Sequence, residues 1–259
     1  MKNFVITQKY FLFLLVFMNV LVKFSLASEV EAIFLKGNEL YKQGDYLAAI
    51  SEYEKIATLG FESWEVYYNL GNAYYKDGQL ARAILNFERA KKLNPKNEDI
   101  NFNLEFANLS VVDRIPQLPT LFIFSWISQV ANVFNLQTLG IITLSLYLLL
   151  GTMIPLRILL KAKSFKKLGA GILIATCILL TFFSSIFIIR IYEAENKIEA
   201  IVLVDKVDVK SAPGEAGTDV FTLHLGVKVQ LQDQSLNWVK IRLSDGKVGW
   251  MKQDQVEKI

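Results

Sequence analysis

Hydrophobic and polar positions between residues 30 and 97 repeat at a fixed distance of 34 residues. Glycine, asparagine, tyrosine and lysine residues recur 34 positions later, and so do an alanine, an isoleucine and an aromatic residue further along the repeat. The matched pairs are Gly37/Gly71, Asn38/Asn72, Tyr41/Tyr75, Lys42/Lys76, Gly44/Gly78, Ala49/Ala83, Ile50/Ile84, Tyr53/Phe87 and Glu54/Glu88. An ordinary helical hairpin that only looks periodic is the alternative, but it does not account for so many pairs at one offset.

A period of 34 residues is typical of the tetratricopeptide repeat, a helix–turn–helix unit that stacks on copies of itself. We therefore expect an all-α domain over 28–115 that contains repeats 30–63 and 64–97. Gly71 and its partner are expected where the two helices of a unit cross, because bulk there would push the backbones apart. Gly78 and its partner are expected where the first helix ends, in the left-handed conformation.

The segment 98–113 is expected to form one more helix, which caps the stack and covers its apolar face. Its apolar residues Phe102, Phe106 and Leu109 recur at helical spacing. The first repeat departs from the second, since Lys36 stands where the second has Leu70. Terminal repeats are often atypical, so this departure agrees with the interpretation.

Residues 1–27 have the pattern of a secretory signal peptide. Lys2 and Lys9 precede an apolar core from Tyr10 to Val22, and Ser25-Leu26-Ala27 is a small-x-small cleavage site. Lys23 directly after the core leaves an uncleaved N-terminal anchor as the alternative. Either version delivers the following residues to the outer face of a membrane.

Two later apolar runs, 138–157 and 168–189, are long enough to cross a bilayer. Core helices of a soluble protein are the alternative, but these would be shorter and would carry a polar stripe. Basic residues and no acidic ones occur in and beside the connection 158–167, namely Arg157, Lys161, Lys163, Lys166 and Lys167. Short loops this basic stay in the cytoplasm, so both soluble parts are expected outside it, in the periplasm beyond the inner membrane.

The segment 116–137 has polar residues on one face at helical spacing and apolar residues on the rest. This pattern favours a helix that lies in the membrane interface with Trp126 as an anchor. A third packed helix in a membrane bundle is the alternative.

In the C-terminal segment 199–259, apolar and polar residues alternate as in β-strands, and Asp245-Gly246 is typical of a hairpin turn. Short strands over about 60 residues predict a small antiparallel barrel. The runs "VDVKSAPG", "LHLGVKVQL", "NWVKIRL" and "DGKVGWMK" resemble a bacterial SH3-type domain, whose Gly-x-x-Gly-Trp marker is matched here by Gly246, Gly249 and Trp250. That resemblance implies peptide or cell-wall binding, for which Trp238 and Trp250 are cleft candidates. Closure of the barrel is the other role open to both tryptophans.

Composition excludes several classes of function. The chain of 259 residues is 53% hydrophobic, which is too apolar for a simple soluble domain. Its net charge is only +3 and basic residues do not interleave with aromatic ones in a dense patch, so we expect no nucleic-acid partner. Cys177 is the only cysteine and His224 the only histidine. No histidine triad and no His/Cys metal cluster can be assembled from them, and we expect no cofactor and no enzymatic activity.

The matched polar pairs predict a peptide-binding groove. Asn38 and Lys42 are four residues apart and share a helix face, and the second repeat has the same arrangement. Amide and ammonium groups suit an acidic peptide or a C-terminal carboxylate, with aromatic surface beside them. The candidate residues are Asn38, Tyr41, Lys42, Asn72, Tyr75 and Lys76. Asparagine as a generic helix-face residue without a ligand is the alternative.

The order of these segments resembles the BatE proteins of aerotolerance operons. The runs "KGNELYKQGDYLAAISEYEKI" and "YYNLGNAYYKDGQLARAILNFERAKKLNPKNEDINFNLEFAN" carry most of the resemblance. It implies a scaffold within a membrane complex linked to oxygen tolerance and stress, with other Bat-type membrane proteins as partners. The alternative function is a cell-envelope sensor or anchor in which the SH3-like domain binds cell-wall peptide.

Overall fold

The computed structural model describes residues 28–116, 118, 133–134, 136–159 and 163–259. The chain divides into two compact units. The first unit comprises residues up to 115 with 199–243 and 247–259, and the second comprises 116–198 with 244–246. The expected signal peptide 1–27 and most of the expected interfacial helix 116–137 lie outside the described residues and stay predictions.

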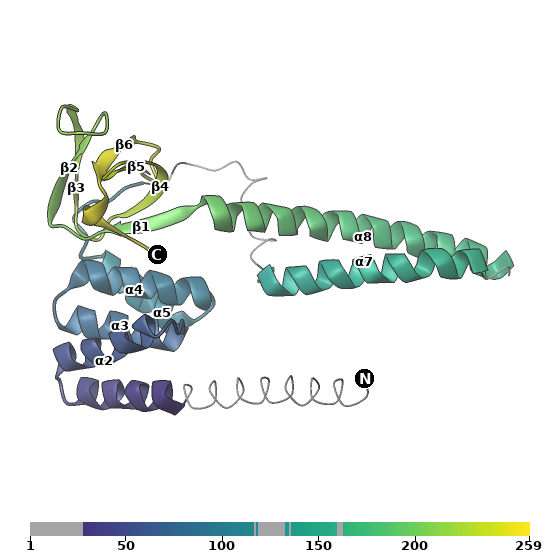
Figure 1. Ribbon diagram of the computed structural model, residues 1–259, viewed down its shortest axis with the longest axis horizontal. Helices are drawn as coiled ribbons and strands as arrows, with labels where there is room; N and C mark the ends of the chain where they lie inside the picture. Colours follow the sequence, from purple (N-terminus) through teal and green to yellow (C-terminus); the bar gives the residue numbers. More distant parts are fainter. Residues whose placement is uncertain (1–27, 117, 119–132, 135, 160–162) are drawn as a thin grey trace, which may run out of the picture. The chain divides into compact units, whose positions relative to one another are not determined.

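A row of helices forms the N-terminal part of the first unit (Figure 1). They are a helix over residues 28–42, α2 (Tyr46–Thr58), α3 (Trp64–Lys76), α4 (Leu80–Leu93) and α5 (Glu98–Asn108). We call residues 28–108 the repeat region. Gly44 and Gly78, at φ of +82° and +83°, follow the helix 28–42 and α3, as expected for glycine helix ends.

The two helices of each repeat approach most closely at the predicted glycines. A Cβ atom added to Gly71 would lie 2.6 Å from Cδ1 of Phe87, and one added to Gly37 would lie 2.6 Å from Cε1 of Tyr53. Both aromatic side chains are 1% exposed. The predicted register is therefore confirmed at both crossings.

The capping helix is shorter than expected, since α5 ends at Asn108 and not at residue 113. Val111 and Val112 follow this end, and β-branched residues lose side-chain freedom in a helix. Asp113 has another role. Its carboxylate accepts the backbone N–H of His224 at 2.7 Å and lies 3.1 Å from the imidazole Nδ1.

Seven described strands form one sheet in the order β3-β2-β6-β5-β4-β1-β7. They are β1 (Ile198–Val202), β2 (Lys206–Lys210), β3 (Asp219–His224), β4 (Lys228–Ser235), β5 (Trp238–Arg242), β6 (Val248–Lys252) and β7 (Val256–Lys258), with a short 3₁₀ helix η1 (Gln253–Gln255) before the last. We call residues 198–258 the strand module. Neighbouring strands pair antiparallel, and Val239 and Ile241 are buried as their alternation predicts.

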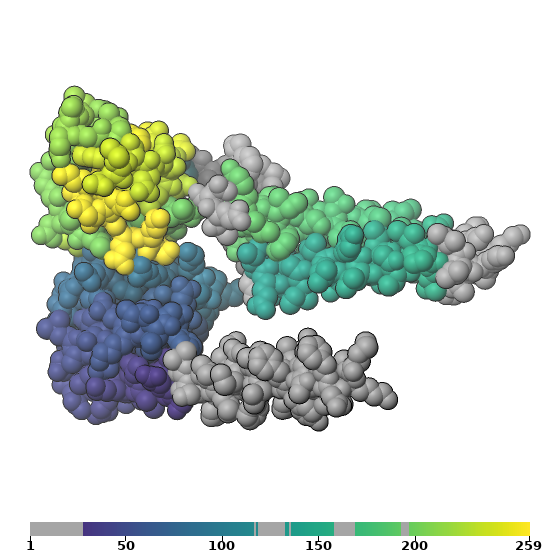
Figure 2. All heavy atoms as spheres, viewed as in Figure 1, coloured from purple at the N-terminus to yellow at the C-terminus, as the bar shows by residue number. Residues whose placement is uncertain are grey.

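Within the first unit the strand module packs directly on the repeat region. Ile201, Leu203 and Leu225 join the apolar core of the repeats, and Figure 2 shows the yellow C-terminal residues resting on blue helices. Gly226 allows the close approach: it has φ of +86°, and an added Cβ would lie 3.0 Å from Ile84 Cδ1 in α4.

Charged groups fix the same contact. The Arg89 guanidinium donates to Glu257 Oε1 at 2.9 Å and to the Lys258 carbonyl at 2.7 Å. The Lys228 ammonium lies between Glu88 at 3.0 Å and Glu199 at 2.7 Å. Burial alone would lower the pKa of Lys228, but the two carboxylates outweigh it and raise that pKa, so the lysine stays charged.

The second unit contains two long helices, α7 (Leu136–Leu159) and α8 (Lys163–Asn196), which pack through Leu139 and Ile186. The stretches Leu136–Arg157 and Gly169–Tyr192 are long and apolar enough to cross a membrane. Twenty-two helical residues span about 33 Å, close to the hydrocarbon thickness.

The basic connection between these helices is shorter than predicted, because residues 163–167 belong to α8 and not to a loop. Lysine is a good helix former, so a basic segment beside an apolar run does not by itself end a helix.

Gly71→Leu should destabilise the repeat region by roughly 1–3 kcal/mol or more, because the added side chain overlaps the Phe87 ring. Thermal unfolding of the full chain in detergent measures the effect. Gly151→Leu is the control, since a Cβ there meets nothing within 4 Å. Equal melting temperatures for the two variants would contradict a tight crossing at Gly71.

Gly226→Val should loosen the strand module from the repeats, because its side chain would overlap Val111 and Ile84 in a backbone conformation unsuited to valine. Hydrogen exchange of β7 and α4 should speed up. Gly214→Val provides the control: it also has positive φ, but open space around its Cβ. If both variants exchange alike, backbone strain and not the contact with the repeats is responsible.

Candidate functional site

A groove of about 390 Å³ opens on the repeat region, between the helix 28–42, α3 and α5. Its lining residues are Tyr41, Tyr68, Asn72, Tyr75, Lys76, Phe87, Phe102, Asn103 and Phe106. We call it the aromatic groove. Four of the six predicted peptide-binding residues line it, namely Tyr41, Asn72, Tyr75 and Lys76. Asn38 and Lys42 are not among its lining residues.

The same amide pair occurs twice along the repeats. Asn69 Nδ2 donates to Asn38 Oδ1 at 2.8 Å, and Asn103 Nδ2 donates to Asn72 Oδ1 at 2.8 Å. Donor and acceptor are 31 residues apart in both cases, so each bond joins one repeat to the next helical unit. The two predicted asparagines therefore use their oxygen atoms to hold neighbouring helices together.

This use of the oxygens determines what the asparagines can offer a ligand. Asn38 Oδ1 also accepts the hydroxyl of Tyr53 at 2.8 Å, which fixes the orientation of that amide. Within the described part of the chain, the Nδ2 groups of Asn38 and Asn72 donate no hydrogen bond. Each nitrogen carries two N–H donors, so a carbonyl or carboxylate oxygen is the complementary partner.

Positive charge comes from Lys42 and Lys76, which are exposed. Neither ammonium forms an ion pair with any residue that the structure describes. The amide nitrogens and the ammonium groups together make this face of the helices attractive to an anion.

The other part of the aromatic groove is apolar. The Tyr75 and Phe106 rings are 5.8 Å apart between centroids, and Phe102 stacks on Phe106 at 6.4 Å. Phe102 is 68% exposed and Phe106 is 51% exposed. Aromatic rings with this much exposure favour contact with an apolar side chain of a ligand.

The hydroxyls of Tyr41 and Tyr53 stay protonated at physiological pH. Burial raises the pKa of Tyr53 to about 12, although the hydrogen bond with Asn69 opposes the shift. Burial also raises the pKa of Tyr41, and nearby Tyr46 and Tyr68 add to the increase. Lys76 is the charged residue in the lining of the groove.

Sequence reasoning missed Tyr68, Phe87, Phe102, Asn103 and Phe106 as lining residues. For Tyr68, Phe102 and Asn103 the sequence contained a usable signal, the 34-residue spacing. Phe34, Tyr68 and Phe102 follow one another at 34-residue spacing, and so do Asn69 and Asn103.

The two tryptophans of the strand module lie on the same face of the sheet. Trp238 pairs with Lys252 and Trp250 pairs with Lys240, whereas Val239 and its partner point to the core side. The Lys252 ammonium lies 5.9 Å from the centroid of the Trp238 ring. Both tryptophans are half-buried, and their role in a cleft stays a prediction.

Three segments of the chain match known families. Residues 30–59 and 64–97 match the tetratricopeptide repeat, and residues 205–257 match the bacterial SH3 domain. The described protein therefore has an all-α tetratricopeptide repeat region, two candidate membrane helices and a C-terminal antiparallel SH3-like domain. The matching families support a protein-binding scaffold. No curated protein matches the chain.

Solved structures similar to this chain include two tetratricopeptide domains. The Sgt2 domain from Aspergillus fumigatus is 23% identical over 31% of this chain and 54% of its own, with a TM-score of 0.30. This chain thus covers about half the length of that structure. The first repeat domain of Spaghetti (RPAP3), bound to the HSP90 peptide SRMEEVD, is 20% identical over 31% of this chain and 91% of its own, with a TM-score of 0.20.

Proposed function

We propose that this protein is a membrane-anchored scaffold whose repeat region binds an extended peptide segment of a protein partner, along the aromatic groove and the surface of the helix 28–42 that carries Asn38 and Lys42. The observation that carries the proposal is the pair of amide nitrogens on Asn38 and Asn72, each without an acceptor among the described residues. They stand in helices that also carry the exposed Lys42 and Lys76.

A carboxylate fits the polar part of this surface. Hydrogen bonds to an ionised oxygen are stronger than those to a neutral one. Amide NH₂ and ammonium groups are both hydrogen-bond donors, so they suit such an acceptor. An acidic side chain or a C-terminal carboxylate of the partner meets this requirement. Because the polar pair Asn38/Lys42 recurs as Asn72/Lys76, an extended segment could place one acidic group at each pair.

The aromatic part sets a second requirement on the partner. A large apolar side chain beside the acidic group would cover the Phe102 and Phe106 rings, which are otherwise exposed to water. Apolar burial is worth roughly 25 cal/mol per Å², so this contact would supply affinity while the charges supply orientation.

The helices α7 and α8 support membrane attachment. Residues such as Ile141, Leu144 and Leu148 are exposed on α7, and Ile174 and Ile178 are exposed on α8. Exposed apolar side chains along helices of spanning length are expected to face lipid. The basic residues of the connection favour its cytoplasmic placement.

We further propose that the aromatic groove and strand module face the periplasm, beyond the inner membrane. The repeat region and strand module form one compact unit, so they must lie on one side of the membrane. The resemblance to BatE proteins supports membership of an aerotolerance complex, in which other Bat-type membrane proteins supply the peptide segment.

Lys42→Glu combined with Lys76→Glu should abolish partner capture while the fold is kept, because exposed charges contribute little to stability. Crosslinking in native membranes followed by mass spectrometry identifies the captured partners. The control makes the same charge change at the exposed Lys96 and Lys206. Capture should also weaken with salt, since exposed charges are screened over about 8–10 Å. Equal recovery of the same partners by both double variants would place the binding site elsewhere.

Single-cysteine labelling tests the orientation after replacement of Cys177 by serine. Ala212→Cys in the strand module should react with an impermeant maleimide in cells with a permeable outer membrane. Lys161→Cys in the basic connection should react only after the inner membrane is breached. The reverse pattern would overturn the topology.

A further inference from the structure

A second pocket lies on another face of α3, away from the aromatic groove. It has a volume of about 610 Å³, with walls from α2, α4 and β7. Tyr67, Leu70 and Tyr74 contribute its α3 side, whereas the aromatic groove uses Tyr68, Asn72 and Tyr75 of the same helix. The pocket thus lies where the repeat region meets the strand module, and ligand sites occur preferentially at such boundaries.

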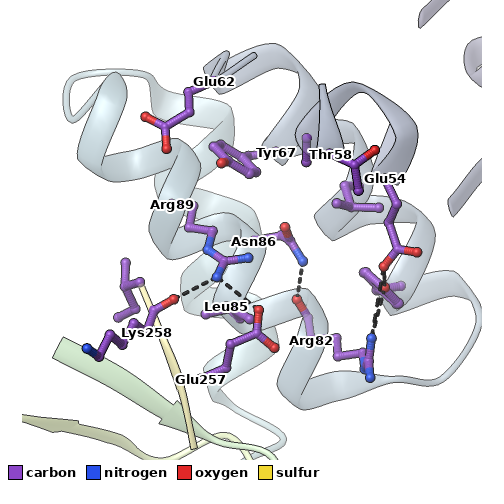
Figure 3. Close-up of a pocket in the computed structure, with 14 residues that line it drawn as sticks. Glu54, Thr58, Glu62, Tyr67, Arg82, Leu85, Asn86, Arg89, Glu257 and Lys258 are labelled. Carbon is purple, nitrogen blue, oxygen red and sulfur yellow. Dashed lines mark hydrogen bonds and ion pairs between the residues drawn. The ribbon is translucent and has the colours of Figure 1, made fainter. Parts of the chain in front are cut away.

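Most of its charged groups are already matched within the protein. Arg89 is held by Glu257 and by the Lys258 carbonyl. Arg82 donates to the Tyr74 hydroxyl at 3.2 Å, and that hydroxyl donates to Glu54. Figure 3 shows both networks at opposite ends of α4, with the labelled side chain of Lys258 pointing away from Asn86.

Apart from the Lys258 ammonium, the unmatched groups are acceptors of hydrogen bonds. Asn86 is 2% exposed, and its Oδ1 has no hydrogen-bond partner in the described part of the chain. Its Nδ2 donates to the Arg82 carbonyl at 2.8 Å, so the amide cannot be turned around without placing two oxygens together. In Figure 3 the oxygen of Asn86 points away from that carbonyl, toward the space beside Tyr67 and Thr58.

A negative charge accompanies this orphan oxygen. Glu62 lines the same pocket and forms no ion pair with a described residue. Glu62 also acts on the nearby Tyr67. Burial raises the pKa of Tyr67 and the Glu62 charge raises it further, whereas the Arg89 charge lowers it. The centroid of the Tyr67 ring already lies 5.8 Å from the Arg89 guanidinium carbon. The unmatched groups beside Asn86 are therefore one carboxylate and one amide oxygen, both of which attract a cation that carries N–H donors.

We propose that this pocket binds a primary ammonium group on an aliphatic stem. The stem packs on Leu70 and Leu85, the ammonium donates to Asn86 Oδ1, and Glu62 offsets its charge. A buried acceptor without a donor destabilises a fold, and a bound ammonium removes that penalty. Two sources have this chemistry, a lysine side chain of a partner and a free diamine, and the experiment separates them.

Binding is measured by calorimetry on the full chain in detergent micelles with three probes. These are N-acetyl-lysine N-methylamide, cadaverine, and N-acetyl-norleucine N-methylamide, which keeps the four-carbon stem of lysine without its ammonium. Binding of the lysine probe at least about tenfold tighter than the norleucine probe supports a protein side chain. Binding of cadaverine alone supports a free amine. Failure of both amines to bind overturns the proposal.

Two variants assign the binding to the named groups. Asn86→Leu should weaken amine binding at least about tenfold while the melting temperature stays equal or rises, because the orphan oxygen is gone. A lower melting temperature, or undiminished binding, would contradict the role given to Asn86. Glu62→Gln should also weaken binding, whereas Glu105→Gln on the exposed side of α5 should not. The Lys42/Lys76 double variant must leave amine binding unchanged, which separates this site from the aromatic groove.

Discussion

The close approach of a glycine to an aromatic ring is the constraint on which the repeat region depends. At Gly37 and Gly71 the backbone lies so near Tyr53 and Phe87 that no Cβ fits. This contact sets the distance between the two helices of each repeat. In the first repeat it does more, because the Tyr53 ring fills the crossing while its hydroxyl donates to the Asn38 amide oxygen. The packing of the core and the direction of a binding group are thus set by the same side chain.

Comparison of residues 34 apart predicted the helices, the glycines at their ends and the helix crossings, because these features recur at equivalent positions of both repeats. It did not predict the bond between Asn69 and Asn38, since that contact joins residues 31 apart. Comparison of a repeat with its copy identifies equivalent positions and not the neighbours that meet across the stack. The same reason explains why the α5 wall of the aromatic groove was missed, although Phe102 continues the series from Tyr68.

The first repeat departs from the second at Lys36, and the contact of Lys36 with Glu52 explains this departure. Lys36 replaces the apolar residue found at Leu70, and Glu52 occupies the position of Asn86. Lys36 and Glu52 form an ion pair at 2.7 Å, and hydrogen bonds from Lys36 and Lys55 hold the pKa of Glu52 below its usual value. The first repeat thus satisfies its buried acceptor internally, while the second leaves the Asn86 oxygen without a donor among the described residues.

The order of segments along the chain constrains how the protein assembles. The repeat region precedes the two apolar helices and the strand module follows them, yet both soluble parts share one compact unit. Under the proposed membrane attachment, contacts such as that between Arg89 and Glu257 require an even number of membrane crossings between the two parts. Two spans meet this requirement and one does not. Under that attachment, the salt bridge and the buried contact at Gly226 form only after both helices have been inserted.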